Sequence, residues 1–167
     1  PPPARTIEPV RSPLLARAQE LVAAGLSGYA SALLRHGEED FLARYPGRRA
    51  LLTLMDAYRR AGDFNRPWLL ALRHALGSLR RLPDRASRAF WDHNYPRCER
   101  KLLRRHAGGD GQLVLFLQGI MRTESGFDPQ ALSVANARGL MQMIPPNASR
   151  VANEIGIEYH DDRLFDP

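Results

Sequence analysis

The sequence has few of the features that mark disulfide-rich or membrane-spanning proteins. Its 167 residues include one cysteine, Cys98, so no disulfide can form within the chain and the redox compartment stays undetermined. Hydrophobic runs are short, as in residues 113–117, and none approaches the ~20 apolar residues that a transmembrane helix needs. The chain opens on three prolines and lacks the charged start and apolar core of a signal peptide, which predicts a mature chain or one expressed without its leader.

Basic residues outnumber acidic ones, although lysine is nearly absent. The net charge is +6, Lys101 is the single lysine, and the other basic residues are arginines scattered among acidic and apolar positions. Residues 112–167 hold four Arg and seven Asp or Glu, a balance of −3, which leaves +9 for residues 1–111. Pairs such as Arg104-Arg105 could bind an acidic polymer or could be ordinary solvated helix faces, and the scattered pattern favours the second interpretation.

A hydrophobic content of 44% and a charged content of 25% are typical of a globular protein, and the apolar periodicity is helical. Residues 1–13 are proline-rich without periodic apolar positions, so we expect an extended lead-in. The pattern then predicts an all-α fold, with paired helices stacked as a solenoid over residues 14–108, a glycine-rich hinge at 108–111 and a second domain over 109–167. The helices predicted in the first part cover residues 14–25, 27–37, 38–45, 48–62, 65–82, 84–91 and 97–106.

The second part begins with an apolar run that ends at a carboxylate, Glu124. On a helix of 3.6 residues per turn, Leu113, Leu117 and Ile120 fall within about 40° of Glu124, so the carboxylate is predicted to end a buried stripe. Partial burial would raise its pKa and suit it to act as a general acid. A Glu in the last turn of a helix can also simply emerge into water. The glycine and proline that follow favour a helix that ends at a cleft.

The residues after Glu124 predict a polar loop and then more helix. Residues 128–138 lack apolar periodicity. A helix is predicted over residues 137–144, where a double proline ends it, with the apolar side chains facing inward. Asn147 is then expected to cap a helix over residues 148–155, which Gly156 ends.

Two blocks of this region resemble the catalytic signature of a known family. The first is the Glu124-Ser125 pair within residues 121–129, and the second is the Gly-Leu-Met-Gln sequence that opens residues 139–145. Further matches are Ser133, Ala137, residues 164–167 and the upstream residues 95–97. Together they resemble the soluble lytic transglycosylases, whose catalytic domain is similar to goose-type lysozyme. The blocks match at the separation expected in that family, whereas helix pairs like those upstream occur in many proteins.

The resemblance implies an enzyme that acts on peptidoglycan in the bacterial periplasm, without a cofactor or metal. It implies that Glu124, as the single general acid and base, cleaves the β-1,4 bond between N-acetylmuramic acid and N-acetylglucosamine. Water is not consumed, and the product carries a 1,6-anhydromuramoyl end. Ordinary glycosidases need two carboxyl groups about 5–9.5 Å apart. The nearby Asp128 precedes a proline in a turn, and a local cap explains it better than a second catalytic role.

The same resemblance implies a set of substrate-binding residues: Ser125, Ser133, Gly139, Leu140, Met141 and Gln142. Ser125 would hydrogen-bond near the carboxylate or the N-acetyl group, Gly139 would let the backbone approach the glycan, and Gln142 would bind a sugar through its amide. Met141 could equally be a core residue by its spacing, and Ser125 could be a helix terminator. Asn136 stands where the family usually has glycine, and Asn tolerates the positive φ that such a position requires.

The family's catalytic domain continues past the landmark at residues 164–167, so we expect this chain to hold only its first part. An inactive fragment, or a non-catalytic helical module that binds the cell wall or a partner, is the alternative. A nucleic-acid-binding helical protein is suggested by the pI of 10.2. Only 8% of residues are aromatic and no stripe alternates basic with aromatic residues, which disfavours this last class. The expected partners are therefore glycan strands and other cell-wall enzymes, with no nucleic acid and no membrane span.

Overall fold

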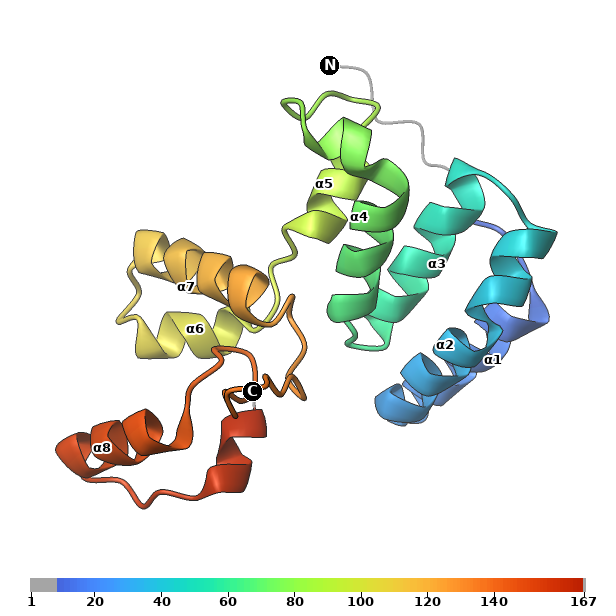
Figure 1. Cartoon of the computed structure of the whole chain (residues 1–167). Helices are drawn as coiled ribbons and strands as arrows, with labels where there is room; N and C mark the ends of the chain where they lie inside the picture. Colours follow the sequence, from blue (N-terminus) through green and yellow to red (C-terminus); the bar gives the residue numbers. More distant parts are fainter. Residues whose placement is uncertain (1–8, 167) are drawn as a thin grey trace. The chain divides into compact units, whose positions relative to one another are not determined.

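The computed structural model describes residues 9–166, and residues 1–8 of the predicted lead-in lie outside the described part. The chain divides into two compact units, Pro1–Asn94 and Tyr95–Pro167. Across the described residues the regular structure is helical, with two isolated β-bridges and no sheet (Figure 1). The predicted all-α class is confirmed.

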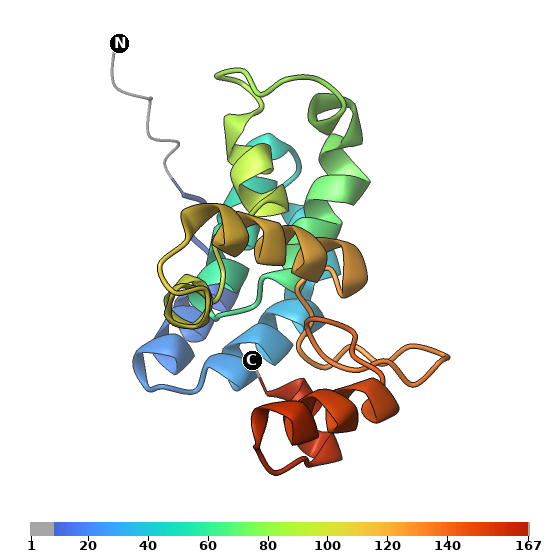
Figure 2. The ribbon, with the colours of Figure 1, turned by 90° about the vertical axis from the view of Figure 1, so that its left-hand side faces the viewer.

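Five helices make up the described part of the first unit, and each packs against the next one along the chain. This sequential packing can be followed from blue to green in Figures 1 and 2. The helices are α1 (Pro13–Ala23), α2 (Ser27–Arg44), α3 (Arg48–Arg60), α4 (Asn65–Leu79) and α5 (Arg88–Asn94). Contacts also join α1 with α3 and α3 with α5, so α3 lies at the centre of the packing and has the most buried side chains.

Local signals explain where α1 and α3 begin and end. The Ser12 hydroxyl accepts a hydrogen bond from the Leu15 backbone N–H, which caps α1, and Pro13 occupies the tolerated first position. Gly25 has a φ of +76° just after α1, and Gly47 has a φ of +98° just before α3. These ends agree with the predicted ones, because glycine adopts such φ values without steric cost.

Several helix ends predicted in the first unit are wrong; for example, the helices predicted to end at residues 82 and 91 end at Leu79 and Asn94. The helices predicted over residues 27–37 and 38–45 are one helix, α2, because Gly37 lies inside it and allows α1 to pack closely. A Cβ at Gly37 would lie 2.8 Å from the Leu14 side chain. The helix predicted from residue 84 begins at Arg88, since Asp84 and Ser87 first close a turn in which the Asp84 carboxylate accepts the Ser87 N–H.

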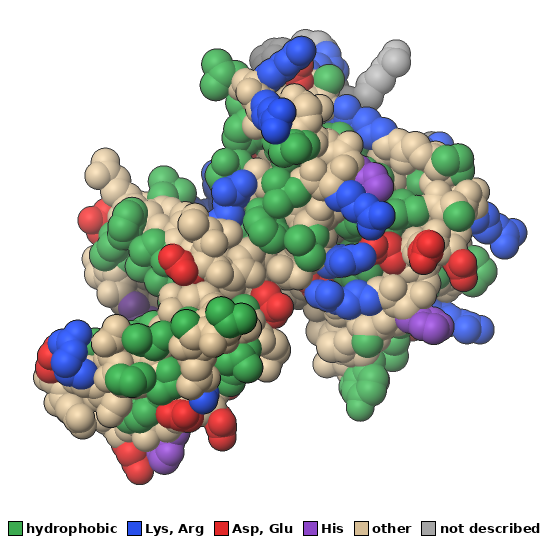
Figure 3. Space-filling model, in the orientation of Figure 1, with side chains coloured by type: hydrophobic (Ala, Val, Ile, Leu, Met, Phe, Trp, Pro, Cys, Tyr) green, Lys and Arg blue, Asp and Glu red, His purple; other side chains and the backbone are tan. Residues whose placement is uncertain are grey.

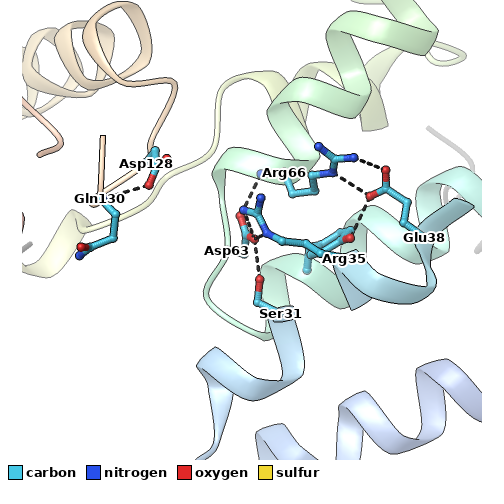
Figure 4. A network of polar contacts seen from close by, with 8 residues as sticks. Ser31, Arg35, Glu38, Asp63, Arg66, Asp128 and Gln130 are labelled. Carbon is cyan, nitrogen blue, oxygen red and sulfur yellow. Dashed lines mark hydrogen bonds and ion pairs between the residues drawn. The ribbon is translucent and has the colours of Figure 1, made fainter. Parts of the chain in front are cut away.

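The core of the first unit contains a polar network as well as apolar side chains (Figure 4). Glu38 of α2 is buried and accepts hydrogen bonds from the Tyr58 hydroxyl of α3, at 2.8 Å, and from the Arg66 guanidinium of α4. Beside it, Asp63 accepts from Ser31 and Arg35, at 2.6 and 2.7 Å. The network therefore ties three helices together through side chains that would be costly to bury unpaired.

The paired groups set the protonation of this network. Burial alone raises the pKa of Glu38, but the hydrogen bonds from Arg66 and Tyr58 and the charge of Arg66 outweigh it, so the pKa lies below its ordinary value. Burial and the neighbouring carboxylate raise the pKa of Tyr58. Glu38 is therefore held as a carboxylate in the folded unit.

The second unit contains α6 (Arg100–His106), α7 (Gly111–Glu124), α8 (Pro145–Ile155) and the short 3₁₀ helix η1 (Asp161–Phe165). The Asp110 carboxylate caps α7 by accepting the backbone N–H groups of Gln112 and Leu113. Before it, Gly108 and Gly109 both have positive φ, which reverses the chain so that α6 and α7 pack together. Among the described residues, no helix is both long and apolar enough to cross a membrane.

The helix predicted over residues 137–144 is wrong. These residues form a tight turn between two β-bridges, in which Arg138 pairs with both Leu132 and Met143. Gly139 and Gln142 have φ values of +71° and +48°, which an α-helix excludes.

The start of the next helix also differs from the prediction. It begins at Pro145 with Ile144 as its cap residue, so the predicted cap at Asn147 is wrong as well. Gly156 ends α8 in the left-handed conformation, as predicted. The predicted domain boundary at residue 109 lies inside the second compact unit and stays a prediction.

Candidate active site

Glu124 is the last residue of α7, and its side chain is exposed. The buried stripe of this helix consists of Val114, Gln118 and Met121, roughly 90° around the helix from Glu124. The predicted burial of Glu124 is therefore wrong: the predicted stripe partner Leu113 is itself 40% exposed. The carboxylate lies at the rim of the unit, where a large substrate can reach it.

The buried side of α7 was predicted wrongly because apolar side chains surround most of this helix. Leu115 and Phe116 are about two-thirds exposed, at 66% and 65%, and they lie on a different side from the buried stripe. Figure 3 shows hydrophobic side chains gathered over this helix. When a helix is apolar on nearly all sides, periodicity alone cannot identify the side that packs.

The segment after Glu124 is held by one side chain. The Ser125 hydroxyl lies 2.9 Å from the Met121 carbonyl oxygen, one turn back in α7, and 2.9 Å from the Leu140 carbonyl oxygen. A hydroxyl has a single proton to donate, so these two carbonyls share it. Ser125 thus connects the end of α7 to the Gly-Leu-Met-Gln turn, and its predicted contact with substrate stays a prediction.

Phe127 is a residue of this site that the sequence analysis did not single out. It has a φ of +67°, yet its side chain is only 3% exposed. A bulky residue rarely adopts this conformation, which costs ~1–2 kcal/mol, and burial of the aromatic ring offsets that cost. Together with Gly126, at φ +58°, it turns the chain sharply away from Glu124. Nothing in the sequence around Phe127 predicts that this residue has a positive φ.

Ser133 also forms local structure. Its hydroxyl accepts the Ala137 N–H at 2.9 Å, and the backbone groups of the same two residues bond at 2.9 Å. This closes a turn in which Asn136 has a φ of +61°, so the predicted positive φ at Asn136 is confirmed. A role of Ser133 in substrate binding stays a prediction.

Gly139 allows a close approach, and the group that approaches belongs to the chain itself. A Cβ at this position would lie 1.8 Å from the carbonyl oxygen of Leu164. The Gly139 N–H donates to the Ala131 carbonyl at 2.9 Å. Gly139 of the first sequence landmark therefore meets Leu164 of the second in space. A close approach of the glycan to Gly139 stays a prediction.

Arg138 fixes the same contact from the side and was not selected by the sequence analysis. Its guanidinium pairs with the Asp161 carboxylate at 2.9 Å and lies 5.8 Å from the centre of the Phe165 ring. Arg138 is half-buried and also lines a cavity together with Leu140 and Met141. Arginines are so common in this sequence that nothing marks Arg138 as a residue of the site.

Leu140 and Met141 line a largely apolar cavity of about 210 Å³ together with Met121 of α7. Gln142 is half-buried, and its amide NH₂ lies 3.1 Å from the carbonyl oxygens of both Ala131 and Gly139. The Gln142 amide therefore has polar partners within the turn itself. Contact of these three residues with a sugar stays a prediction.

Asp128 has a local role. Its carboxylate accepts the Gln130 N–H at 2.9 Å, which closes a short turn next to Pro129. This is the capping role predicted for it. Among the described residues, no cluster of three or more His, Cys, Asp or Glu side chains is arranged to hold a metal ion. The groups at the end of α7 are thus one exposed carboxylate, a shared hydroxyl proton and a rigid turn.

A helix that ends in Glu-Ser and is tied to a Gly-Leu-Met-Gln turn defines a class of protein. Residues 105–167 match the model of the family described as Transglycosylase SLT domain. This part of the chain is therefore similar to the transglycosylase domain of the soluble lytic type, in agreement with the resemblance found in the sequence.

The curated relatives share a short and very similar segment with this chain. Each of the following is described as a membrane-bound lytic murein transglycosylase C. The protein of Histophilus somni strain 2336 is 51% identical over 49 residues, 29% of this chain and 14% of the relative. That of Mannheimia succiniciproducens is 54% identical over 46 residues, 28% of this chain and 12% of the relative. That of Haemophilus influenzae strain PittEE is 53% identical over 51 residues, 30% and 13% of the two chains.

The matched segment therefore spans about one seventh of the length of these relatives. No solved structure matches the chain. The family model, over residues 105–167, includes both Glu124 and the Gly-Leu-Met-Gln turn.

Proposed function

We propose that the protein is a peptidoglycan lytic transglycosylase in which Glu124 is the single general acid and base. The observation that carries this proposal is the connection between Glu124, Ser125 and the Gly-Leu-Met-Gln turn, within the segment that matches the transglycosylase domain. Glu124 is exposed, so a long polymer can reach it without opening the fold. A bound strand would displace water from the carboxylate and strengthen its interaction with the glycosidic oxygen.

The proposed reaction needs one carboxyl group. Protonated Glu124 donates its proton to the oxygen between N-acetylmuramic acid and N-acetylglucosamine, and this bond breaks. The substrate's N-acetyl group stabilises C1. The C6 hydroxyl oxygen then attacks C1, while the Glu124 carboxylate takes the proton from that hydroxyl. The product has a 1,6-anhydromuramoyl end. Because Asp128 is committed to its own turn, it does not supply the second carboxylate of a hydrolytic mechanism.

The substrate also implies a location. The named relatives are membrane-bound and act on murein, and we extend to this chain a place in the bacterial envelope, facing the periplasm. Within the proposed site, Gln142 and Met141 bind the sugar rings, Ser125 and Ser133 keep the two loops in place, and Leu140 and Gly139 form the floor. Other cell-wall enzymes are the expected protein partners.

The test compares Glu124→Gln with Glu154→Gln, an exposed glutamate of α8 in the same unit that serves as a matched control. Purified peptidoglycan is incubated with each protein, and released anhydro-muropeptides are quantified by mass spectrometry. Loss of a general acid lowers the rate by roughly 10²–10⁴-fold, so Glu124→Gln should release almost none, while Glu154→Gln should equal the wild type.

A non-catalytic wall-binding module is the second candidate. It predicts that the wild type sediments with peptidoglycan but releases no anhydro-muropeptides, and that Glu124→Gln sediments equally well. Release of reducing-end muropeptides by the wild type would indicate hydrolysis and would contradict the proposed lyase reaction.

A further inference from the structure

Helix α6 carries four cations on its outer side, which we name the cationic face: Arg100, Lys101, Arg104 and Arg105. At 100° per residue, their directions span about 140° of the helix. All four side chains are exposed. Throughout residues 9–166, none of the four makes an ion pair or side-chain hydrogen bond. Four unpaired cations on two turns of helix repel one another, so an anionic ligand would be favourable there.

The other side of α6 is apolar and already occupied. Leu102 and Leu103 are half-buried and line the cavity shared with Met121 and Met141. Glu99, the one acidic residue in residues 95–107, lines the same cavity. Within the described part of the chain, Glu99, the only acidic side chain of this segment, thus makes no ion pair with the cationic face.

The first turn of α6, which carries Arg100 and Lys101 of the cationic face, lies beside the helix that ends at Glu124. The Gln118 amide of α7 donates to the Cys98 carbonyl at 2.8 Å, which places the start of α6 beside the middle of α7. Glu124 is six residues farther along α7, ~9 Å at 1.5 Å per residue. A polymer lying across Glu124 can thus reach the first turn of α6.

We infer that the cationic face binds the carboxylates of the peptide stems of peptidoglycan while the glycan strand lies at Glu124. This inference rests on the proposed function, because it takes peptidoglycan as the substrate. Three of the four cations are arginines, whose planar guanidinium groups bind carboxylates through two parallel hydrogen bonds. The glycan backbone presents mainly hydroxyl and amide groups, so the stems supply the negative charge.

A membrane surface suits this helix less well. Helices that lie in a membrane interface place apolar or aromatic side chains toward the lipid, next to their cations. In α6 the apolar side chains are Leu102 and Leu103, and both are taken up by the cavity. Carboxylates of a water-exposed polymer need no such apolar side.

The experiment compares two variants that remove the same charge from different places. The first is Arg100→Gln, Lys101→Gln, Arg104→Gln and Arg105→Gln together. The matched control is Arg17→Gln, Arg73→Gln, Arg80→Gln and Arg85→Gln together, four exposed arginines of the first unit that also have no ion pair among the described residues. Both variants are checked for helix content by circular dichroism, and both are made with Glu124→Gln so that the substrate stays intact.

Binding is measured by sedimentation with intact peptidoglycan and with glycan strands from which an amidase has removed the stems. The lactyl carboxylates that this hydrolysis leaves on the glycan are first converted to neutral amides. The parent protein is the chain with Glu124→Gln alone. The first variant should bind intact peptidoglycan about tenfold more weakly than this parent, and the control should bind like the parent. The parent should lose a similar factor on stem-free strands and on raising the salt concentration.

Three results would overturn the inference: unchanged binding by the first variant, equal loss in the control, or equal binding of the parent to stem-free strands. Preferential binding to phosphatidylglycerol vesicles or to duplex DNA would assign the face to another anion and would overturn it too. Product release is measured separately on the chain with native Glu124. Stem-dependent binding without anhydro products would refute the proposed reaction and leave the stem contact standing.

Discussion

At Gly139 the backbone touches Leu164 so closely that no other residue fits. Gly139→Ala should lower the free energy of unfolding of the second unit by at least ~2 kcal/mol, because φ is +71° and the Cβ would meet a backbone carbonyl that cannot move cheaply. The effect is measured by urea unfolding, in which the loss of protection of Cys98 from alkylation reports the unfolding of the second unit.

The matched control is Gly119→Ala, in the middle of α7. A Cβ at Gly119 meets nothing within 4 Å, so the substitution should raise stability by ~0.5–1 kcal/mol. Equal behaviour of the two variants would contradict the close approach at Leu164.

Cys98 is 3% exposed, and burial together with the charge of Glu99 raises the pKa of its thiol to about 12. At pH 8 the thiolate fraction is then on the order of 10⁻⁴, so iodoacetamide should label the native protein very slowly. Mass spectrometry follows the labelling, and guanidinium-unfolded protein provides the fast reference. Rapid labelling under native conditions would show that Cys98 is accessible.

Residue-level predictions succeeded where backbone chemistry decides and failed where packing decides. A positive φ at Asn136 and a capping role for Asp128 follow from local preferences, and both are confirmed. The burial of Glu124 depends on which side of α7 faces α6, and no residue of the helix carries that information. The positive φ of Phe127 depends on its buried ring and has no local signal.

The elements of the first unit are joined by the network of Glu38, Tyr58 and Arg66. Arg66→Met should destabilise this unit by ~3 kcal/mol, because it leaves the Glu38 carboxylate buried beside a single hydroxyl donor. Tryptophan fluorescence during urea unfolding measures the loss. A change below 1 kcal/mol would show that water replaces the guanidinium.

The same network predicts an acid dependence. The pKa of Glu38 in the folded protein lies below its ordinary value of 4.5, so its stabilising contribution is complete above that value and is lost as the pH falls through the folded pKa. Unfolding midpoints at pH 6 and pH 3 should differ less in Glu38→Gln than in the wild type. The exposed neighbour provides the control, since Glu39→Gln should keep the wild-type difference.

Among the helices, the sequence was informative where glycine or proline marks an end and uninformative where glycine serves packing. Gly25, Gly47 and Gly156 end or precede helices as predicted. Gly37 and Gly139 were misinterpreted, because each lies against a distant segment. The apolar Gly-Leu-Met-Gln-Met-Ile pattern is that of a helix, yet hydrogen bonds to Ala131 hold it as a turn.

For the whole molecule, the two compact units carry separate natural probes. Both tryptophans, Trp68 and Trp91, lie in the first unit, and the single thiol, Cys98, lies in the second. Because each unit has its own internal packing, Arg66→Met should shift the unfolding midpoint seen by fluorescence and leave the midpoint of Cys98 labelling in place. Gly139→Ala should do the reverse. Coincident shifts in both variants would show a single cooperative transition.

The contact between Gly139 and Leu164 has a consequence for engineering. A designer who transplants the Gly-Leu-Met-Gln turn into a foreign scaffold will obtain a different loop unless η1, which supplies the Leu164 carbonyl, is transplanted too. The two short sequence stretches therefore act as one structural part, although more than twenty residues separate them in the chain.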